Sequence, residues 1–419
     1  GVLFAYYRTP PAAANRRRLL LAAVAPLAGM LGVVSTWSFP TVGGLAVLTL
    51  TFAPGHPADL LPGPLSGWLS ADRGAIRDEV VRTGVALVLG AAVLVGGLLV
   101  VLPFFLGTAS GRGLGLLPDR SPLGPLLLVH GTFLLVSALY LRDRLPVAAS
   151  ERRRWQLLAA WTVALVATWL YQATVLVVVA PLVVVGWWLL RRTDRVSFET
   201  VLIVAAAGLV VLVEFAFVQE EAGPGRMNTV FKTYAQVWVL WATGAAAVFP
   251  GVAATPEAVS ALVADLRGAV ARRWQRSRPE RPAPNGGDAD RPDSTRRFGG
   301  REHVRAVLAV GLLLSLSLYG AFGLGWQIHT GRDDPTLDAR SFVRDQHPGE
   351  VRAIEWLADR PGQPTIASAP GVRIYGWVNG PSSLTGVPTV AGWAHEIGYR
   401  GDSAYFERVR EGNRLFNGS

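Results

Sequence analysis

No cysteine occurs among the 419 residues of this chain. Disulfide bonds, thiolate catalysis and cysteine-based metal sites are therefore excluded. Lysine is nearly absent as well, because Lys232 is the only one in a chain with 39 arginines. Charged residues make up only 17% of the sequence and hydrophobic residues 51%, whereas soluble proteins of this size normally carry more charge. This composition indicates a membrane protein.

Long apolar segments are the main feature that is present. Runs of about 18 or more nearly uncharged residues recur, and this is the length that a helix needs to cross a bilayer. The sequence predicts a mainly α, polytopic transmembrane helical bundle over residues 1–327. We expect nine spans, at residues 19–36, 39–55, 83–106, 124–141, 155–170, 172–190, 200–218, 233–252 and 304–327.

The arginines decide the predicted orientation. With nine spans, one set of loops before residue 328 holds 26 basic residues and the opposite set holds only 4. Because cytoplasmic loops are enriched in basic residues, we expect the N-terminus in the cytoplasm and the C-terminus outside the cell membrane. The net charge of +10 then reflects the arginines that set the topology, and these arginines are also attracted to anionic membrane lipids. It does not predict nucleic-acid binding.

Two segments differ in character from the apolar runs. Residues 254–303 are rich in Arg and Pro and predict a disordered cytoplasmic loop within the membrane domain. Residues 328–419 are nearly neutral and predict a small extracytoplasmic α/β domain. In it, "GEVRAIEWLADRPG" has apolar residues at helical spacing and stops at Pro-Gly. The segments "PTIASA" and "VRIYGWV" are typical of short strands.

The single lysine lies in the segment "GRMNTVFKTYAQVW", residues 225–238. With Asn228 or Thr229 as N-cap, Lys232 falls in the first turn of the eighth span, where a cation opposes the helix dipole. A bound anion removes this conflict, so we expect Arg226, Asn228, Lys232 and Gln236 to bind a phosphate. The alternative is that Arg226 and Lys232 are interfacial anchors.

Further polar and aromatic residues are candidates for the same site. Glu214, within the seventh expected span, is a candidate catalytic base or metal ligand, although snorkelling or pairing with Arg226 would also satisfy its charge. His130 is expected to be a hydrogen-bonded structural histidine or to line the site. His395 and Glu396 lack the second histidine of a zinc-binding helix, so metal ligands are not identified. The aromatic residues of the segment fit the belt at a membrane surface; they are Phe231, Tyr234, Trp238 and Trp241.

Several motifs resemble the "YYY" integral membrane family of archaea and Chloroflexi-type bacteria, which is grouped with GT-C-type glycosyltransferases. "RMNTVFKTYAQVW" resembles its hallmark segment, and "STWSFP" resembles its Asn-Thr-Trp-Asp-aromatic-Pro loop. "LPFFLG" with "GLGL" resembles its Leu-Pro-Phe loop. "TLDA" with "AIEWL", and "SSLTGVPTVAGWAHEIGYRG", resemble its C-terminal signature. The resemblance extends over nearly the whole chain.

The resemblance implies a GT-C-like bundle with its site on the outer face. Such enzymes use a polyprenyl-phosphate-linked sugar and pass it to a lipid, glycan or protein acceptor, often with a divalent metal. No nucleotide, flavin or haem is expected. The residues expected to line the site, beyond the phosphate ligands, are Trp37, Tyr234, His130, His395, Glu396 and Arg400.

The chain departs from that family in three places. Ser35 and Ser38 stand where the family commonly has Asn and Asp. An upstream Gly-Asp-Leu-His segment is absent, which is the part where GT-C enzymes usually keep their catalytic acid. The C-terminal domain ends without a closing element. We therefore expect a chain that lacks N-terminal spans and the end of its C-terminal domain.

The resulting hypothesis is a membrane glycosyltransferase that uses an inverting displacement on the extracytoplasmic face. Two other classes remain open from the sequence. A transporter or flippase of a phosphorylated lipid would use the same anion site, but it predicts polar residues through the midplane of the membrane. A non-catalytic membrane scaffold would present the C-terminal domain to partners.

Overall fold

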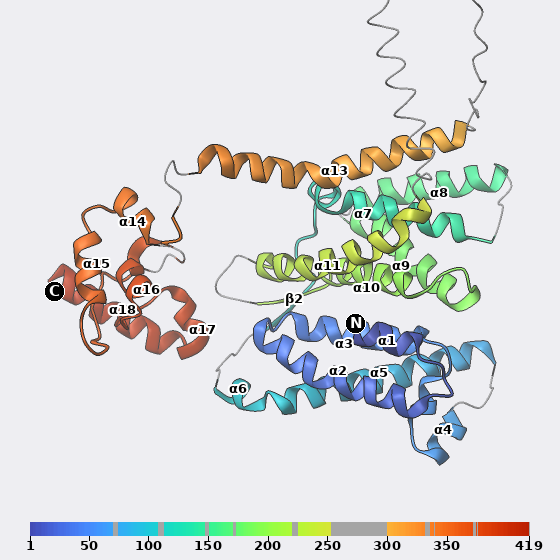
Figure 1. Ribbon diagram of the computed structural model, residues 1–419, viewed down its shortest axis with the longest axis horizontal. Coiled ribbons are helices and arrows are strands. Elements are labelled where there is room, and N and C mark those ends of the chain that lie inside the picture. Colours follow the sequence, from blue (N-terminus) through green and yellow to red (C-terminus); the bar gives the residue numbers. More distant parts are fainter. Residues whose placement is uncertain are drawn as a thin grey trace, which may run out of the picture. The chain divides into compact units, whose positions relative to one another are not determined.

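The computed structural model describes residues 1–69, 74–107, 113–146, 151–170, 173–219, 225–252, 300–331, 336–338, 340–371, 374 and 376–418. Most of these residues are helical, and one two-stranded sheet is present (Figure 1). They form two compact units, which we describe separately. Residues 254–299 of the expected cytoplasmic loop lie outside the described residues.

The first unit begins with a group of helices that pack on one another. These helices are α1 (Val2–Arg8), α2 (Ala14–Val34), α3 (Ser38–Phe52) and α5 (Ala75–Val100). The helices α2 and α5 approach closely at Gly29 and Gly97, since a Cβ atom on Gly29 would lie only 2.4 Å from the Gly97 carbonyl oxygen. Glycine is required at such a crossing because any side chain would separate the backbones. Short elements follow: η1 (Pro57–Leu60), α4 (Gly63–Leu69) and α6 (Leu102–Gly107).

A small antiparallel sheet also belongs to this unit. Strand β1 (Leu114–Leu116) pairs with β2 (Ala216–Val218), so that Leu114 lies opposite Val218. Strand β2 follows helix α10 (Phe198–Leu212), which means that the expected span 200–218 is wrong at its C-terminal end. The motif "STWSFP" is not a complete loop either, because α3 begins at Ser38.

The second unit contains α7 (Leu123–Arg144), α8 (Glu151–Leu170), α9 (Thr174–Arg192) and α13 (Gly300–Thr330), with parts of α10 and α11 (Met227–Val252). Helix α9 packs against both α7 and α8. The side chain of Tyr140 on α7 donates a hydrogen bond to Glu199 on α10 at 2.6 Å and lies 3.2 Å from Thr200. These polar groups of α7 and α10 are thus paired across helices, as an apolar surrounding favours.

The C-terminal segment is built of short helices, which are α14 (Ser341–Gln346), α15 (Val351–Ala358), α16 (Gly380–Thr385), α17 (Ile397–Arg400) and α18 (Asp402–Asn417), with the 3₁₀ turns η2 (Trp377–Asn379) and η3 (Ala394–Glu396). Helix α15 confirms the predicted helix. The expected strand in "PTIASA" is wrong, because only Ile366 forms an isolated bridge, with Thr389. The second expected strand is partly outside the described residues, and its end forms η2.

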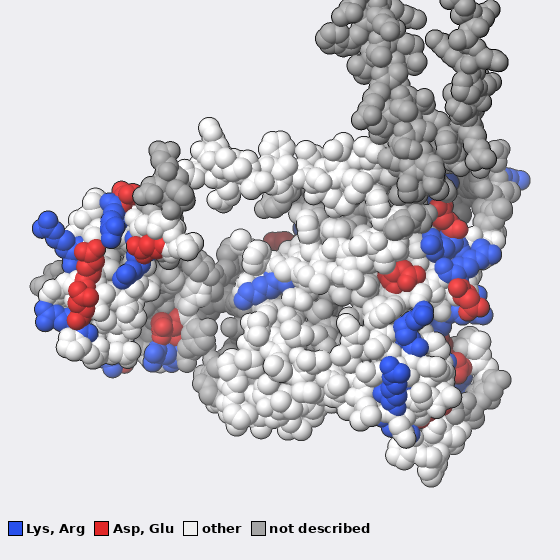
Figure 2. Space-filling model, viewed as in Figure 1, with Lys and Arg blue, Asp and Glu red and all other residues white. Residues whose placement is uncertain are grey.

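The nine expected spans all fall on segments that are largely helical. Among the described residues, five helices are long and apolar enough to cross a membrane, namely α2, α5, α7, α9 and α13. The apolar helices Ser38–Phe52, Ala159–Leu170 and Phe198–Leu212 are shorter. Figure 2 shows broad uncharged surfaces along the helices and charged side chains mostly near their ends. The chain is therefore a multi-pass membrane protein, and nine spans with an inward N-terminus remain a prediction.

The predicted orientation can be tested with single cysteines, because the chain has none. Asp119 precedes α7 and Asp194 follows α9, and both side chains are exposed. If the charge bias sets the topology, a membrane-impermeant maleimide added to intact cells labels Asp119→Cys, whereas Asp194→Cys reacts only after permeabilisation. The two variants are matched, since each replaces one exposed aspartate. The reverse pattern would show that the orientation is wrong.

Candidate functional site

The expected anion-binding segment forms the start of helix α11. This helix begins at Met227, so Asn228 and Thr229 lie within its first turn and the predicted N-cap is wrong. The Thr229 hydroxyl instead accepts a hydrogen bond from the backbone N–H of Val218 at 3.0 Å, which ties α11 to strand β2. Lys232 consequently lies in the second turn. There the helix dipole acts on it less strongly than at the first residues.

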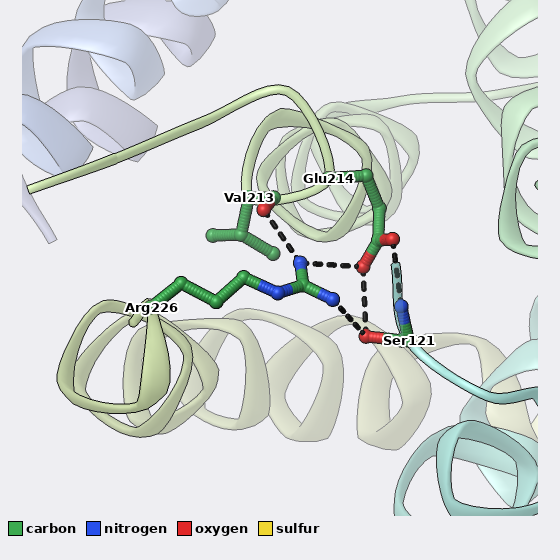
Figure 3. Close-up of polar contacts among 4 residues, drawn as sticks. All are labelled: Ser121, Val213, Glu214 and Arg226. Atoms are coloured by element: carbon green, nitrogen blue, oxygen red, sulfur yellow. Dashed lines mark hydrogen bonds and ion pairs between the residues drawn. The ribbon is translucent and has the colours of Figure 1, made fainter. Parts of the chain in front are cut away.

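Arg226, directly before α11, binds several groups at once (Figure 3). Its Nη1 donates to the Val213 carbonyl at 2.7 Å and to Glu214 Oε1 at 3.0 Å. Its Nη2 donates to the Ser121 hydroxyl at 2.9 Å. The side chain of Arg226 is only 11% exposed, so its charge is compensated inside the protein rather than by water.

Glu214 is the acidic partner in this network. It lies in the turn between α10 and β2, not within a span as expected, and it is 0% exposed. Its Oε1 also accepts from the Ser121 hydroxyl at 2.8 Å, and its Oε2 accepts from the Ser121 backbone N–H at 3.0 Å. Both carboxylate oxygens are therefore hydrogen-bonded. Pairing with Arg226, the alternative left open by the sequence, is what the structure shows.

The network joins three parts of the chain that are distant in sequence. Ser121 precedes α7, Glu214 follows α10, and Arg226 precedes α11. Tyr234, on the third turn of α11, is close enough to these three residues to interact with them electrostatically. Nearby, the guanidinium of Arg120 lies over the Phe215 ring at 5.0 Å. Chemically, this arrangement holds a charge pair in place. Because Glu214 is buried and fully bonded, the geometry does not favour a role in taking a proton from a substrate.

Three polar residues follow on one face of α11, at positions i, i+4 and i+8. They are Asn228, Lys232 and Gln236, and we call them the polar strip. All three are half-buried. Within the described part of the chain, neither Lys232 nor Gln236 makes a side-chain hydrogen bond, and Lys232 forms no ion pair. Lys232 thus differs from Arg226, whose guanidinium is bound to protein atoms.

The neighbouring aromatic residues do not share one environment. Phe231 is 73% exposed and Trp238 is 42% exposed, as expected for side chains that face lipid. Trp241 is buried in the second unit, where its ring lies edge-on to His130 at 5.2 Å and stacks on Phe133 at 5.9 Å. His130 therefore belongs to an aromatic cluster inside the helices.

The remaining expected site residues lie on other elements. Trp37 is half-buried between α2 and α3. In the C-terminal segment, Arg400 donates a hydrogen bond to Glu396, and His395 lies 6.3 Å from the Trp393 ring. None of these residues hydrogen-bonds to Lys232 or Gln236 as far as the structure describes the chain.

A metal site would depend on how the acidic residues and histidines are arranged. Over the described residues, no group of three or more histidines, aspartates or glutamates gathers in one place. The divalent metal that the resemblance to GT-C enzymes implies therefore stays a prediction, and we derive no step through a metal.

One family model matches the chain. It is the model of an uncharacterized membrane protein family (DUF2298), and it covers residues 1–241. The match includes Ser121, Glu214, Arg226 and the polar strip. No curated protein matches the chain. No solved structure matches it either.

The buried ion pair predicts a strong coupling between its partners. Glu214→Gln or Arg226→Gln alone should lower the free energy of unfolding by about 3–5 kcal/mol, because each leaves the opposite charge buried without a counter-charge. The double variant should lose less than the sum of the single losses. Unfolding of the detergent-solubilised chain, followed by circular dichroism, measures this.

Glu396→Gln is the control, because it removes one partner from an exposed ion pair. Such pairs contribute at most about 1 kcal/mol. Additive losses in the double variant at positions 214 and 226 would contradict the buried pair.

Proposed function

The chain belongs to this family of uncharacterized membrane proteins (DUF2298). From the resemblance of its motifs to GT-C-type glycosyltransferases, together with the polar strip, we propose that it is a membrane glycosyltransferase. The donor would be a sugar linked to a polyprenyl phosphate, and the polar strip of α11 would bind the lipid phosphate. The observation that carries the proposal is Lys232, a half-buried cation that makes no ion pair within the described residues.

Lys232 suits a lipid phosphate for several reasons. Its ammonium group is a compact point charge on a flexible stem, which can follow a phosphate as the sugar is transferred. A half-buried cation on an apolar helix of a membrane protein raises the free energy of the folded state unless a counter-charge is nearby. A bound phosphate would supply that counter-charge. Gln236 lies one turn further along α11 and Asn228 one turn before, so amide groups on both sides can donate to phosphate oxygens.

Arg226 and Glu214 take a different part in this proposal. Their ion pair, closed by Ser121, fixes the position of the first turn of α11. The polar strip begins only two residues after Arg226, so the network orients the strip. Arg226 is then a positioning residue rather than the first ligand of the phosphate, and Glu214 is its counter-charge rather than the catalytic base.

The proposed reaction is a single displacement at the anomeric carbon of the sugar. The acceptor oxygen forms a bond to this carbon while the bond to the phosphate oxygen breaks, and the phosphate leaves with the electron pair. A base takes the proton of the acceptor hydroxyl. The positive charge of Lys232 stabilises the negative charge that grows on the leaving phosphate. With the predicted orientation, the reaction takes place on the extracytoplasmic face.

The test is lipid binding to the detergent-purified chain, measured by native mass spectrometry. Polyprenyl phosphate, polyprenyl-phosphate-hexose and uncharged polyprenol are offered to the wild type, Lys232→Ala, Lys232→Arg and Arg195→Gln. Loss of a charge-assisted hydrogen bond of about 1.5–3 kcal/mol should weaken binding of the two phosphates by about 10- to 100-fold in Lys232→Ala. Lys232→Arg should retain part of the affinity.

Arg195→Gln is the matched control, because it removes one exposed cation from the loop between α9 and α10. It should bind as the wild type does. Equal affinity of wild type and Lys232→Ala, or equal affinity for polyprenol and polyprenyl phosphate, would contradict the phosphate site. A flippase would be favoured instead if the lipid binds and moves across the bilayer of vesicles, but its sugar is not transferred to any acceptor.

A further inference from the structure

Arg17, in the first turn of α2, is a buried cation in the first unit, far from the polar strip in sequence. It is only 2% exposed. Its guanidinium lies over the Tyr6 ring at 4.4 Å from the ring centroid. Across the described residues it forms no ion pair, and its Nε is buried without a hydrogen-bond partner. A buried charge normally has a counter-charge, because desolvation of an isolated ion is costly.

The acidic side chains nearby are engaged with other groups. The Asp59 carboxylate accepts a hydrogen bond from the His56 backbone N–H at 3.1 Å. Asp78 lies 3.8 Å from His56 Nε2 and 3.9 Å from Arg82 Nε. Neither carboxylate forms an ion pair with Arg17, so no described acid of the region is in direct contact with this charge.

A second unsatisfied donor lies next to Arg17. Tyr6 is 0% exposed, its hydroxyl lies beside the Arg17 guanidinium, and no acceptor among the described residues takes its proton. Burial raises the pKa of Tyr6 to about 12, so the hydroxyl keeps its proton at physiological pH and can donate it to an acceptor. Tyr6 on α1 and Arg17 on α2 therefore present two donors to one place, where α1, α2 and α3 pack together (Figure 1).

The backbone makes room for the guanidinium. Gly55, after α3, has a φ of +81°, and a Cβ atom there would lie 3.1 Å from Arg17 Nη1 and 2.9 Å from Pro11. The carbonyl of the same glycine accepts a hydrogen bond from Arg82 Nη1 at 2.7 Å. Two arginines thus approach Gly55, and one of them, Arg82, has the Asp78 carboxylate beside it.

We propose that Arg17 and Tyr6 form a binding site for one phosphate-type oxyanion. The planar guanidinium matches two oxygens of a phosphate, and the tyrosine hydroxyl adds a third donor. The anion would supply the counter-charge that Arg17 lacks. This site goes beyond the proposed function, because it uses α1 and α2 rather than α11, and the charge bias predicts it at the cytoplasmic end of the helices. The phosphate belongs to a lipid headgroup or to a free anion.

The test is thermal unfolding of the full detergent-purified chain. The probes are inorganic phosphate, with sodium chloride at the same ionic strength as reference, and dihexanoyl phosphatidic acid, with dihexanoyl phosphatidylcholine as reference. A probe at tenfold its Kd should raise the Tm of the wild type by about 1–2 °C. A rise with both probes assigns a free-anion site, and a rise with phosphatidic acid alone assigns a lipid headgroup.

The variants are Arg17→Gln, Tyr6→Phe and, as the matched control, Arg16→Gln, which removes an exposed cation at the neighbouring position. Arg16→Gln should keep the full shift, Arg17→Gln should lose it, and Tyr6→Phe should require about tenfold more probe. If Arg17→Gln fails to fold, Tyr6→Phe still decides. No shift in the wild type, or equal shifts in the wild type and Tyr6→Phe, would overturn the site. Neither result depends on Lys232.

Discussion

The arrangement of the candidate site depends on one buried charge, that of Glu214. A carboxylate that is 0% exposed in an apolar helical protein must be bound on all sides or lose its charge. Arg226 and Ser121 satisfy it together, and with Glu214 itself they come from three separate segments of the chain. The same contacts that neutralise Glu214 therefore hold the start of α11 beside the β1–β2 sheet. The position of the polar strip is a consequence of this pairing.

The helical segments could be predicted because the length of an apolar run is a property of the local sequence. Their ends could not be predicted in the same way. The expected span 200–218 ends at Leu212, because Glu214 turns inward to Arg226 and the following residues pair with β1. In the C-terminal segment, apolar residues at helical spacing identified α15. The segment "PTIASA" begins with one proline, is followed by another, and forms only one bridge, from Ile366 to Thr389. The sequence around Thr389 did not predict this pairing.

The sequence predicted which residues are candidates for the site, but it did not predict all of the hydrogen bonds and ion pairs among them. The sequence indicated that Arg226, Lys232 and Glu214 are unusual, since charges are rare in the apolar part of the chain. It did not indicate Ser121, which lies 93 residues before Glu214 and contributes both its hydroxyl and its backbone N–H. The predicted N-cap failed for a related reason. Thr229 bonds to Val218 across a loop, and this contact depends on the sheet rather than on the helix sequence.

Whether a cation is available to a ligand therefore depends on where the acids lie in space. Arg226 and Arg17 are both nearly buried, yet only Arg226 has a carboxylate within an ion-pair distance in the described structure. Arg226 is consequently part of the framework, whereas Arg17 has donors that the described protein atoms do not use. Lys232 lies between these two cases in burial, because its side chain is half-buried and therefore still partly accessible to solvent or lipid. An external anion gains most where the protein has placed a cation without an internal partner, and this criterion favours Lys232 and Arg17 over Arg226 as ligand-binding residues.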